Sequence, residues 1–406
     1  MDLSPLRESR DFRLLWIGDL ISHTGQHITV VALPFQMYQL TGSALAVGLI
    51  GLAQVGPLIA FALIGGAIAD RYDRRRLLII SQVGSMAASL ILVGGAVAGD
   101  PPVWLLYLAA AISSAFGALD APTRSAATPR LVSKKRLSSA IALNQLGFQV
   151  NDVVGPALGG VIIAWAGLAT AYLIDTVTFL AAIWAILLMK PMPPDEDESR
   201  TSVLRSVREG FSYLKGRRVL QSTFLIDINA MVFGMPRALF PLLAVEAFHV
   251  GPIGLGLLYA APGAGAMIGA LLTGWVQHVR HQGRVVLWAV AVWGLAIVGF
   301  GLSTEAFALA LVFLAIAGAA DVISAIFRGT ILQSSVPDRL RGRLSGIHIM
   351  VVVSGPRLGD FEAGLVAQLV SPVFSVVSGG LACVAGVAVI AAAVPQFRRY
   401  HAGDPA

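Results

Sequence analysis

Apolar residues lie along this chain in long stretches that short polar segments separate. Twelve stretches are about 20 residues or longer, which is enough for a helix to cross a 30 Å hydrocarbon core. Backbone groups in lipid must be hydrogen-bonded within their own segment, so each stretch is predicted to be helical. The predicted helices cover residues 14–39, 43–69, 77–98, 103–123, 137–164, 168–189, 220–246, 252–277, 285–302, 305–328, 343–368 and 372–394.

The longest polar segment covers residues 190–219. It opens with KPMPPDEDESR, whose prolines and acids cannot pack in lipid, and continues with the amphipathic sequence SVLRSVREGFSYLKGRRVL. The second part predicts a short helix on the membrane surface, with a solvated linker as the alternative. We therefore predict a six-helix half over residues 1–189, a cytoplasmic linker over 190–219, and a second six-helix half with a short tail over 220–406.

Composition supports an integral membrane protein. Of the 406 residues, 56% are hydrophobic and only 13% are charged, whereas soluble domains carry about 25% charged residues. A water-soluble globule could not cover itself with so few polar side chains. This excludes a soluble enzyme and a nucleic-acid-binding module. The single cysteine, Cys383, also excludes an intrachain disulfide and a scaffold built on such bonds.

The distribution of basic residues predicts the topology. If the N-terminus is cytoplasmic, 27 of the 29 lysines and arginines fall in segments on that side. The positive-inside rule then places both termini in the cytoplasm. No small-residue cleavage site follows a short apolar core near the start, so we expect no cleaved signal peptide. The two remaining basic residues, Arg237 and Arg357, lie within predicted helices.

The two halves repeat each other weakly, as halves of transporters often do. At an offset of 208 residues, Asp19 corresponds to Asp227, Gly48 to Gly256, Gly66 to Gly274 and Arg76 to Arg284. At offsets near 200, GPALGG at 155–160 corresponds to GPRLGD at 355–360, and Asp120 corresponds to Asp321. These matches predict pseudo-symmetric halves.

Two motifs stand out between and within the predicted helices. The stretch GGAIADRYDRRRLL, with Gly66, Asp70, Arg71, Arg74 and Arg75, resembles the signature loop of the major facilitator superfamily, G-x-x-x-D-R-x-G-R-R, with Asp73 where the pattern has glycine. The stretch VGPALGG resembles the Gly-Pro motif of exporters in that superfamily, with Asn151 in place of the leading glycine; the matching residues are Gly155, Pro156, Gly159 and Gly160.

This resemblance implies an all-α membrane protein with twelve transmembrane helices in two pseudo-symmetric bundles around a central cavity. It also implies a monomeric secondary transporter in the bacterial inner membrane that exports a small organic molecule, siderophore-like or drug-like, against entering protons. A facilitator or importer on the same fold and a non-transporting receptor are the alternatives. No lysine follows a glycine, so no ATP-binding phosphate loop can be written. We expect no enzyme activity, cofactor, metal or nucleic-acid partner.

Four acids lie within predicted spans, one each on the first, fourth, seventh and tenth helices: Asp19, Asp120, Asp227 and Asp321. A charged side chain at membrane depth costs at least about 3 kcal/mol, so each should face a partner or a cavity. The resemblance implies that these helices line the cavity. It also implies that Asp120 closes an inner gate with Arg74 or Arg75, and the repeat assigns Asp321 to Arg280 or Arg284.

Asp19, His23 and Asp227 are the candidates for proton coupling. His23 follows Asp19 by four residues, which puts both on one helical face, and a carboxylate in a cavity that alternates between wet and dry surroundings can bind and release a proton. The alternative for Asp19 is a structural pair with Arg13.

Asp152, Arg237, Arg357 and Asp360 are candidates to line the cavity or contact substrate. Asp152 could instead hydrogen-bond between helices. Arg357 and Asp360 share a helical face, either as a static pair or as a pair whose arginine exchanges Asp360 for an anionic group on the cargo. Arg237 could reach the outer surface by extending its side chain.

Overall fold

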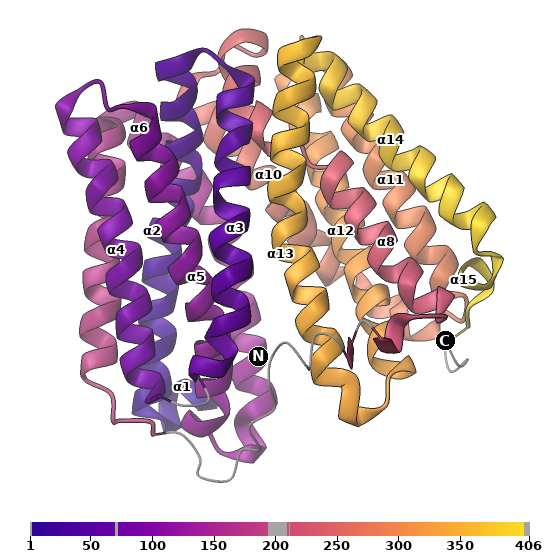
Figure 1. The fold of residues 1–406 in the computed structure, drawn as a ribbon, viewed down its shortest axis with the longest axis horizontal. Helices are drawn as coiled ribbons and strands as arrows, with labels where there is room; N and C mark the ends of the chain where they lie inside the picture. The colour runs from indigo at the N-terminus through magenta and orange to yellow at the C-terminus, as the bar shows by residue number, and fades with distance from the viewer. Residues whose placement is uncertain (1, 70–71, 194–208, 211, 402–406) are drawn as a thin grey trace. The chain divides into compact units, whose positions relative to one another are not determined.

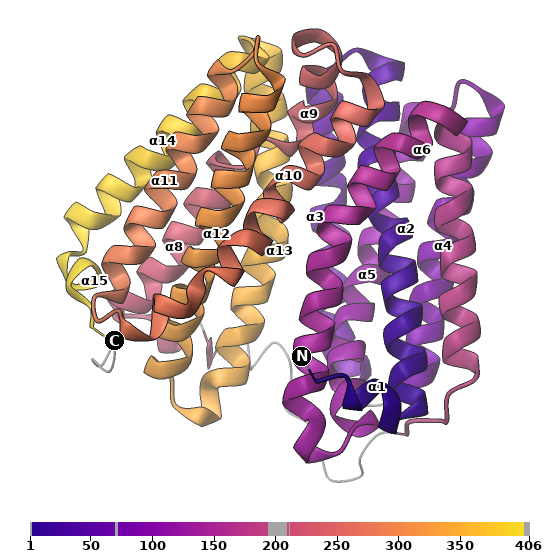
Figure 2. The same ribbon diagram turned by 180° about the vertical axis from the view of Figure 1, so that it is seen from behind.

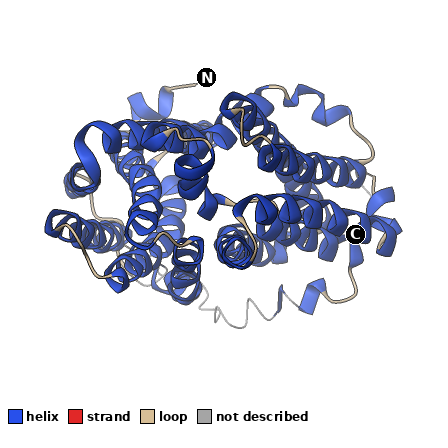
Figure 3. Ribbon diagram, turned by 90° about the horizontal axis from the view of Figure 1, so that it is seen from above, coloured by secondary structure: helices blue, strands red, loops and turns tan. Residues whose placement is uncertain are grey.

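A computed structural model describes residues 2–69, 72–193, 209–210 and 212–401, and the described part is helical without strands (Figure 3). The first half contains α1 (Ser4–Glu8), α2 (Arg10–Thr41), α3 (Ala44–Ala69), α4 (Arg74–Ala98), α5 (Val103–Leu131), η1 (Lys134–Arg136) and α6 (Leu137–Leu187). The second half contains α8 (Arg218–Phe233), η2 (Arg237–Leu239), α9 (Phe240–Leu242), η3 (Leu243–Ala247), α10 (Gly251–Leu271), η4 (Thr273–His278), α11 (Gln282–Leu302), α12 (Phe307–Ser335), α13 (Asp338–Leu369), α14 (Pro372–Ala393) and α15 (Pro395–Arg399).

Twelve membrane-spanning segments can be assigned within the described residues. Nine helical segments there are long and apolar enough to cross a bilayer. One of them, Lys134–Leu187, contains two spans, because Gly167 has φ 79° and interrupts α6 where the sequence predicts a turn. The helices α2 and α13 are 32 residues long but more polar. Together these give the predicted all-α, twelve-span fold.

The chain forms two compact units, each containing a short segment from the other half of the sequence. Unit 1 comprises Met1–Thr41, Ala53–Val203 and Gly251–Ala260, and unit 2 comprises Gly42–Leu52, Leu204–Val250 and Ala261–Ala406. The predicted surface helix within 190–219 lies largely outside the described residues.

In unit 1, α2 packs along α6, and α4 packs on both α5 and α6 (Figure 1). Small residues allow the close approach of α2 and α6: a Cβ built on Gly18 would lie 3.2 Å from the Ala185 Cβ, and one on Gly25 would lie 3.0 Å from the Asp175 Cα. No hydrophobic driving force brings helices together in lipid, so their crossings are enriched in small residues that let the backbones approach closely.

In unit 2, α11 packs between α12 and α14, while α8 packs against α13 and α14 (Figure 2). Trp293 of α11 is fully buried, and Gly294 faces Gly380 of α14, where a built Cβ would lie 2.8 Å from the Gly380 carbonyl oxygen. The only cysteine, Cys383, is buried on α14 near Asn229 of α8. Trp293, Cys383 and the Gly294–Gly380 crossing therefore form part of the buried core of unit 2.

The short segment that each unit takes from the other half of the sequence, Gly251–Ala260 in unit 1 and Gly42–Leu52 in unit 2, makes a close glycine crossing. In unit 1, a Cβ built on Gly256 of α10 would lie 2.6 Å from the Pro156 carbonyl oxygen and 2.9 Å from the Gly160 Cα. In unit 2, a Cβ on Gly48 of α3 would lie 2.5 Å from the Asp360 carbonyl oxygen and 3.2 Å from the Gly364 Cα. Gly48 and Gly256 are equivalent in the sequence repeat. Each unit therefore has one helix crossing that leaves no room for a side chain at this glycine.

Three helices depart from the predicted limits in ways that bear on the site. The helix α5 continues to Leu131 rather than ending at 123, and α12 continues to Ser335 rather than ending at 328. The predicted helix over 220–246 is interrupted after Phe233 and resumes at Arg237. Arg124, one residue beyond a predicted helix end, and Arg328, the last residue of a predicted helix, therefore both lie well within helices.

Candidate functional site

The first charge cluster joins α2 to α5 in unit 1. His23 Nδ1 lies 2.8 Å from Asp19 Oδ1, and Arg124 Nε lies 3.0 Å from the same oxygen. Arg124 Nη2 lies 2.9 Å from Asp120 Oδ2, one helical turn earlier on α5. The side chains of Arg124 and Asp19 are 12% and 23% exposed. We call His23, Asp19, Arg124 and Asp120 the unit 1 cluster.

Polar side chains of α4 hold Asp120 in place. Its Oδ1 accepts hydrogen bonds from Ser81 Oγ at 2.6 Å and from Gln82 Nε2 at 3.0 Å, and both residues are buried. One carboxylate thus connects to α4 through one oxygen and to Arg124 through the other. Buried carboxylates are stable when they are paired and hydrogen-bonded, and Asp120 has both kinds of contact.

The second charge cluster lies in unit 2 and has the same composition. Arg328 Nη1 of α12 lies 2.6 Å from Asp227 Oδ1 of α8, and Arg328 Nη2 lies 3.8 Å from Asp321 Oδ1. His348 Nδ1 of α13 lies 4.0 Å from Asp227 Oδ2. The side chains of Asp227 and Arg328 are 0% and 2% exposed. We call these four residues the unit 2 cluster.

The basic partners of Asp120 and Asp321 differ from the predicted ones. Asp120 contacts Arg124 instead of Arg74 or Arg75, and Asp321 contacts Arg328 instead of Arg280 or Arg284. Each arginine lies on the same helix as the acid, because α5 continues through Arg124 to Leu131 and α12 continues through Arg328 to Ser335. Asp19 contacts Arg124 and His23, whereas Arg13 donates to the Leu6 carbonyl oxygen.

Arg124, Arg328 and His348 are site residues that sequence reasoning missed. Arg124 follows Asp120 by four residues, a spacing that could have identified the pair once α5 was known to continue. Arg328 follows Asp321 by seven residues, two helical turns. No local pattern connects His348 to Asp227, because α13 and α8 meet only in the folded unit.

The described part of the signature loop fastens α4 to the end of α6. Asp73 is the N-cap of α4: its Oδ1 accepts from the Arg76 N–H at 3.0 Å, and its Oδ2 accepts from the Met192 N–H at 2.8 Å. Arg75 donates to the carbonyl oxygens of Ile186 and Leu187, which satisfies groups that a helix end leaves open. Arg74 is buried, whereas Asp70 and Arg71 lie outside the described residues, as do the surroundings of Gly66.

The Gly-Pro motif packs α6 against two helices. Gly155 and Gly159 face α2, where built Cβ atoms would meet His27 and the Ile28 Cα, respectively, while Gly160 faces Gly256 of α10. Asn151, which replaces the leading glycine of the motif, is buried and accepts from Thr24 Oγ1 at 2.8 Å. Asp152, the next residue, is partly exposed.

The candidates Arg237, Arg357 and Asp360 gather where the chain is interrupted after α8. Asp360 Oδ1 of α13 accepts from the Ala238 N–H at 2.9 Å, next to Arg237. Arg357 donates through Nη1 to the Val353 carbonyl oxygen, one turn earlier on α13. Arg237 therefore lies at the start of a short 3-10 turn instead of inside a continuous helix.

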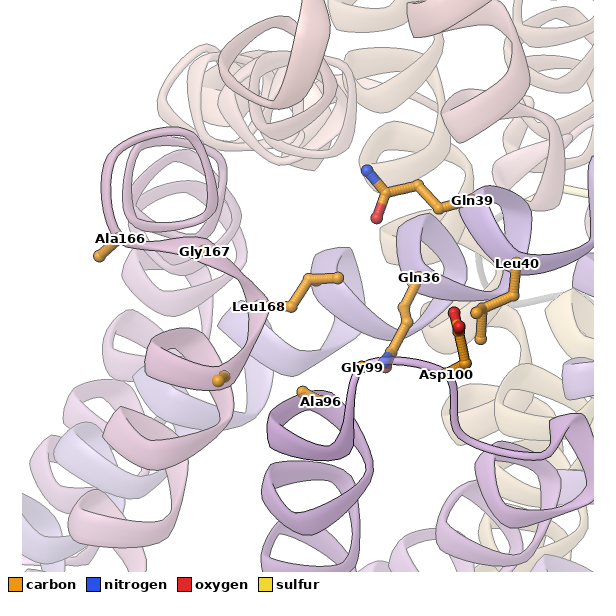
Figure 4. Close-up of a pocket in the computed structure, with 10 residues that line it drawn as sticks. Gln36, Gln39, Leu40, Ala96, Gly99, Asp100, Ala166, Gly167 and Leu168 are labelled. Carbon is orange, nitrogen blue, oxygen red and sulfur yellow. The ribbon is translucent and has the colours of Figure 1, made fainter.

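A pocket of about 430 Å³ lies elsewhere in unit 1, at the ends of α2 and α4 and at the interruption of α6 (Figure 4). It is lined by Gln36, Gln39, Leu40, Ala96, Gly99, Asp100, Ala166, Gly167, Leu168 and Ala169. Gln36 is about 26 Å along α2 from Asp19 at 1.5 Å per residue. The pocket is thus separate from the unit 1 cluster.

The twelve-span fold, the family match and the named relatives together identify a membrane transporter of the major facilitator superfamily. The chain belongs to the family described as transmembrane secretion effector, which it matches over residues 1–403. It is 27% identical over 405 residues to the enterobactin exporters EntS of Citrobacter koseri and Shigella boydii, covering 100% of this chain and 97% of each exporter.

Solved structures of other transporters share the fold. A POT family transporter in complex with 5-aminolevulinic acid has a TM-score of 0.75 and 12% identity, over 96% of this chain and 97% of the other. A bacterial homologue of ferroportin in an inward-facing state has a TM-score of 0.70 and 15% identity, over 98% of this chain and 100% of the other. These neighbours and relatives are transporters, not enzymes.

Proposed function

We propose that the chain is a proton-coupled exporter that moves a small organic molecule, siderophore-like or drug-like, out of a bacterial cell by alternating access. Membership of a family described as secretion effectors supports export. The chain matches 97% of the length of relatives named enterobactin exporters, which supports a siderophore-like cargo. In this proposal both termini lie in the cytoplasm, on the side rich in lysine and arginine.

The charge of the unit 1 cluster is the observation that carries the proposal. With His23 neutral, Asp19, Asp120 and Arg124 carry a formal charge of −1, and one added proton brings the cluster to zero. Histidine is the side chain that titrates in the physiological pH range, and His23 contacts Asp19 directly. The cluster therefore has the composition of a site that holds one proton.

Protonation would change how α2 and α5 are joined. Arg124 contacts both Asp19 and Asp120. A proton on His23 gives Asp19 a second cationic partner that also repels Arg124, so the arginine then interacts mainly with Asp120 and the link to α2 weakens. In this mechanism, proton binding and release alter the helix contacts that accompany alternating access.

The remaining predicted roles stay part of the proposal. The signature loop, with Gly66, Asp70, Arg71, Arg74 and Arg75, is assigned to the inner gate, as are Asp120 and Asp321. Asp73 accepts hydrogen bonds from α4 and from the segment after α6, which supports a structural connection between the signature loop and both elements. Asp227 is a second candidate for proton coupling, through the unit 2 cluster.

Transport into everted membrane vesicles tests the proposal. Vesicles with an imposed proton gradient are offered enterobactin and, separately, ethidium as a drug-like probe. We expect the wild type to accumulate at least one probe and to stop when a protonophore collapses the gradient. His23→Gln and Asp19→Asn should abolish gradient-driven accumulation, while His278→Gln, at an exposed histidine, should leave it unchanged.

Two outcomes would contradict the proposal. Accumulation that equilibrates without a gradient would identify a facilitator on the same fold. Gradient-driven export that survives both His23→Gln and Asp19→Asn, at matched protein levels, would remove the unit 1 cluster from the coupling mechanism.

A further inference from the structure

Asp175 is a buried acid that neither charge cluster uses. It lies on the second span of α6, and 1% of the residue is exposed. Its Oδ2 accepts hydrogen bonds from Thr29 Oγ1 of α2 and from Ser89 Oγ of α4, both at 2.6 Å. One carboxyl oxygen therefore joins three helices of unit 1.

The other carboxyl oxygen has no hydrogen-bond partner among the described residues. Asp175 Oδ1 is buried and lies beside Gly25 of α2, where a built Cβ would be 2.7 Å from it. Within the described part of the chain, no lysine, arginine or histidine forms an ion pair with Asp175. In both charge clusters, by contrast, an arginine contacts the acids. Asp175 thus has hydroxyl partners where the cluster acids have basic ones.

The helices packed around Asp175 hold their charged groups elsewhere. The charged residues of α4 lie at its start, and the last of them, Arg76, is about 20 Å along the helix from Ser89. On α2, His23 belongs to the unit 1 cluster, and His27 faces the first span of α6. A charged carboxylate at membrane depth is costly without a compensating partner, whereas a neutral acid needs only hydrogen bonds. These surroundings therefore favour a protonated Asp175.

A row of polar groups leads from Asp175 toward the pocket of unit 1. Tyr172, three residues earlier on α6, donates through its hydroxyl to Gln36 Oε1 at 2.8 Å, and Gln36 lines that pocket (Figure 4). Along α2, Thr29 lies about 10 Å from Gln36 and about 15 Å from Asp19. Asp175 therefore lies between the pocket and the unit 1 cluster. The pocket is at the end of α2 away from the N-terminus, which is the outer end in the proposed topology.

We propose that Asp175 is a second proton-binding site of unit 1, which takes up a proton from the pocket side and passes it to the unit 1 cluster. The inference rests on the proposed export function and adds a step to its proton pathway. In the loaded state the carboxyl group is a neutral acid. On release its O–H bond breaks and the proton moves through water to His23. The remaining carboxylate keeps the hydrogen bonds from Thr29 and Ser89 until the next proton enters.

Infrared spectroscopy of the purified full-length protein in detergent tests whether Asp175 holds a proton. A carboxylic acid has a carbonyl stretching band that a carboxylate lacks, and at about pH 5 most exposed carboxyl groups are ionised. We expect Asp175→Asn, which keeps the shape of the neutral acid, to lose one such band in the difference spectrum against the wild type. Glu305→Gln, at an exposed acid of unit 2, is the matched control and should keep that band.

Ser89→Ala assigns the band independently. It removes one hydrogen bond to Asp175 Oδ2, and a carbonyl group that accepts fewer hydrogen bonds vibrates at higher frequency. We therefore expect the same band to move to higher frequency in Ser89→Ala. This result keeps the test decisive if Asp175→Asn does not fold.

The pH dependence of unfolding gives a second readout. An aspartate in an unfolded chain ionises near pH 4, so a folded protein that holds a proton on Asp175 releases it on unfolding at higher pH. The unfolded state then binds fewer protons than the folded state, and stability falls as the pH rises. The unfolding midpoint of Asp175→Asn should therefore gain on that of the wild type from about pH 5 upward. An ionised Asp175 predicts a constant difference.

Vesicle transport tests the passage of the proton. Asparagine cannot exchange a proton, so Asp175→Asn should abolish gradient-driven accumulation of the probe that the wild type transports, whereas Glu305→Gln should retain it. The proposal is overturned if Asp175→Asn leaves the carboxylic acid bands unchanged, or if it transports like the wild type at matched protein levels.

The spectroscopic and unfolding measurements need no proton gradient, so they separate the two proposals. A protonated Asp175 in a protein without gradient-driven transport would contradict coupled export and support the proton site. Gradient-driven transport by a protein whose Asp175 is ionised would do the reverse.

Discussion

The two charge clusters contain the same residue types but place them differently. In unit 1, the histidine and its aspartate are one turn apart on α2, and Asp19 is partly exposed. In unit 2, the histidine comes from α13, lies 4.0 Å from Asp227, and the aspartate is completely buried against Arg328. Each cluster carries a formal charge of −1 with its histidine neutral. The clusters differ in how closely the histidine contacts its aspartate and in how deeply that aspartate is buried, rather than in charge.

This difference suggests a division of labour. A buried ion pair is hard to separate, because breaking it leaves an uncompensated charge in a low-dielectric interior. A partly exposed pair with a histidine attached can change its protonation at lower cost. We therefore expect unit 2 to respond to substitution mainly through stability and unit 1 mainly through transport.

The largest expected effect is loss of stability in Arg328→Gln. Asp227 would remain buried without its partner, which costs about 3–5 kcal/mol, and the unfolding midpoint of the detergent-purified protein should fall accordingly. The double variant Asp227→Asn with Arg328→Gln should recover most of the loss, because it removes both charges. A single variant as stable as the wild type would show that the pair contributes no stability.

Arg124→Gln should cost less stability, about 1.5–3 kcal/mol, the range for hydrogen bonds to charged groups. Solvent reaches Asp19 and screens the unpaired charge. The same unfolding measurement, made beside Arg328→Gln, checks the order of the two effects. If Arg124→Gln proved the more destabilising variant, exposure would not be what distinguishes the clusters.

The two histidines should differ in how they affect pH dependence. His23→Gln should abolish gradient-driven vesicle transport at every pH, because it removes the side chain that titrates in the physiological range. His348→Gln should change the rate by less than about threefold, because His348 lies farther from its aspartate. Equal effects of the two substitutions would contradict the assignment of proton coupling to unit 1.

The glycine crossings are expected to give the smallest effects. Gly256→Ala and Gly48→Ala would each place a Cβ against a carbonyl oxygen at 2.6 and 2.5 Å, so we expect a net loss of about 1 kcal/mol after the gain in helix propensity. Gly56→Ala, on the same helix as Gly48 but with open space around it, should gain up to about 1 kcal/mol. Unfolding midpoints of the three variants check these signs.

Helix positions could be predicted because a bilayer demands long apolar stretches, and the acids stood out because charge in those stretches is costly. The basic partners of these acids could not be predicted, because local sequence signals indicated the wrong helix ends. Pro122 and Pro129 indicate a helix end near Arg124, yet α5 runs through both prolines to Leu131. The interruption after α8 did carry a signal, since Gly234 and Pro236 flank it. His348 carried none, because its contact with Asp227 depends on tertiary packing.

Asp73 has a consequence for how this family is recognised from sequence. It stands where the signature pattern has glycine, and it caps α4 through its own carboxylate. Aspartate, asparagine, serine, threonine and glycine are the residues that helix N-caps prefer, so the physical requirement at this position is a cap rather than a particular residue. Alignments of relatives should therefore show these five residues exchanging freely there. A search profile that scores the position by capping ability would recover members that a strict glycine pattern overlooks.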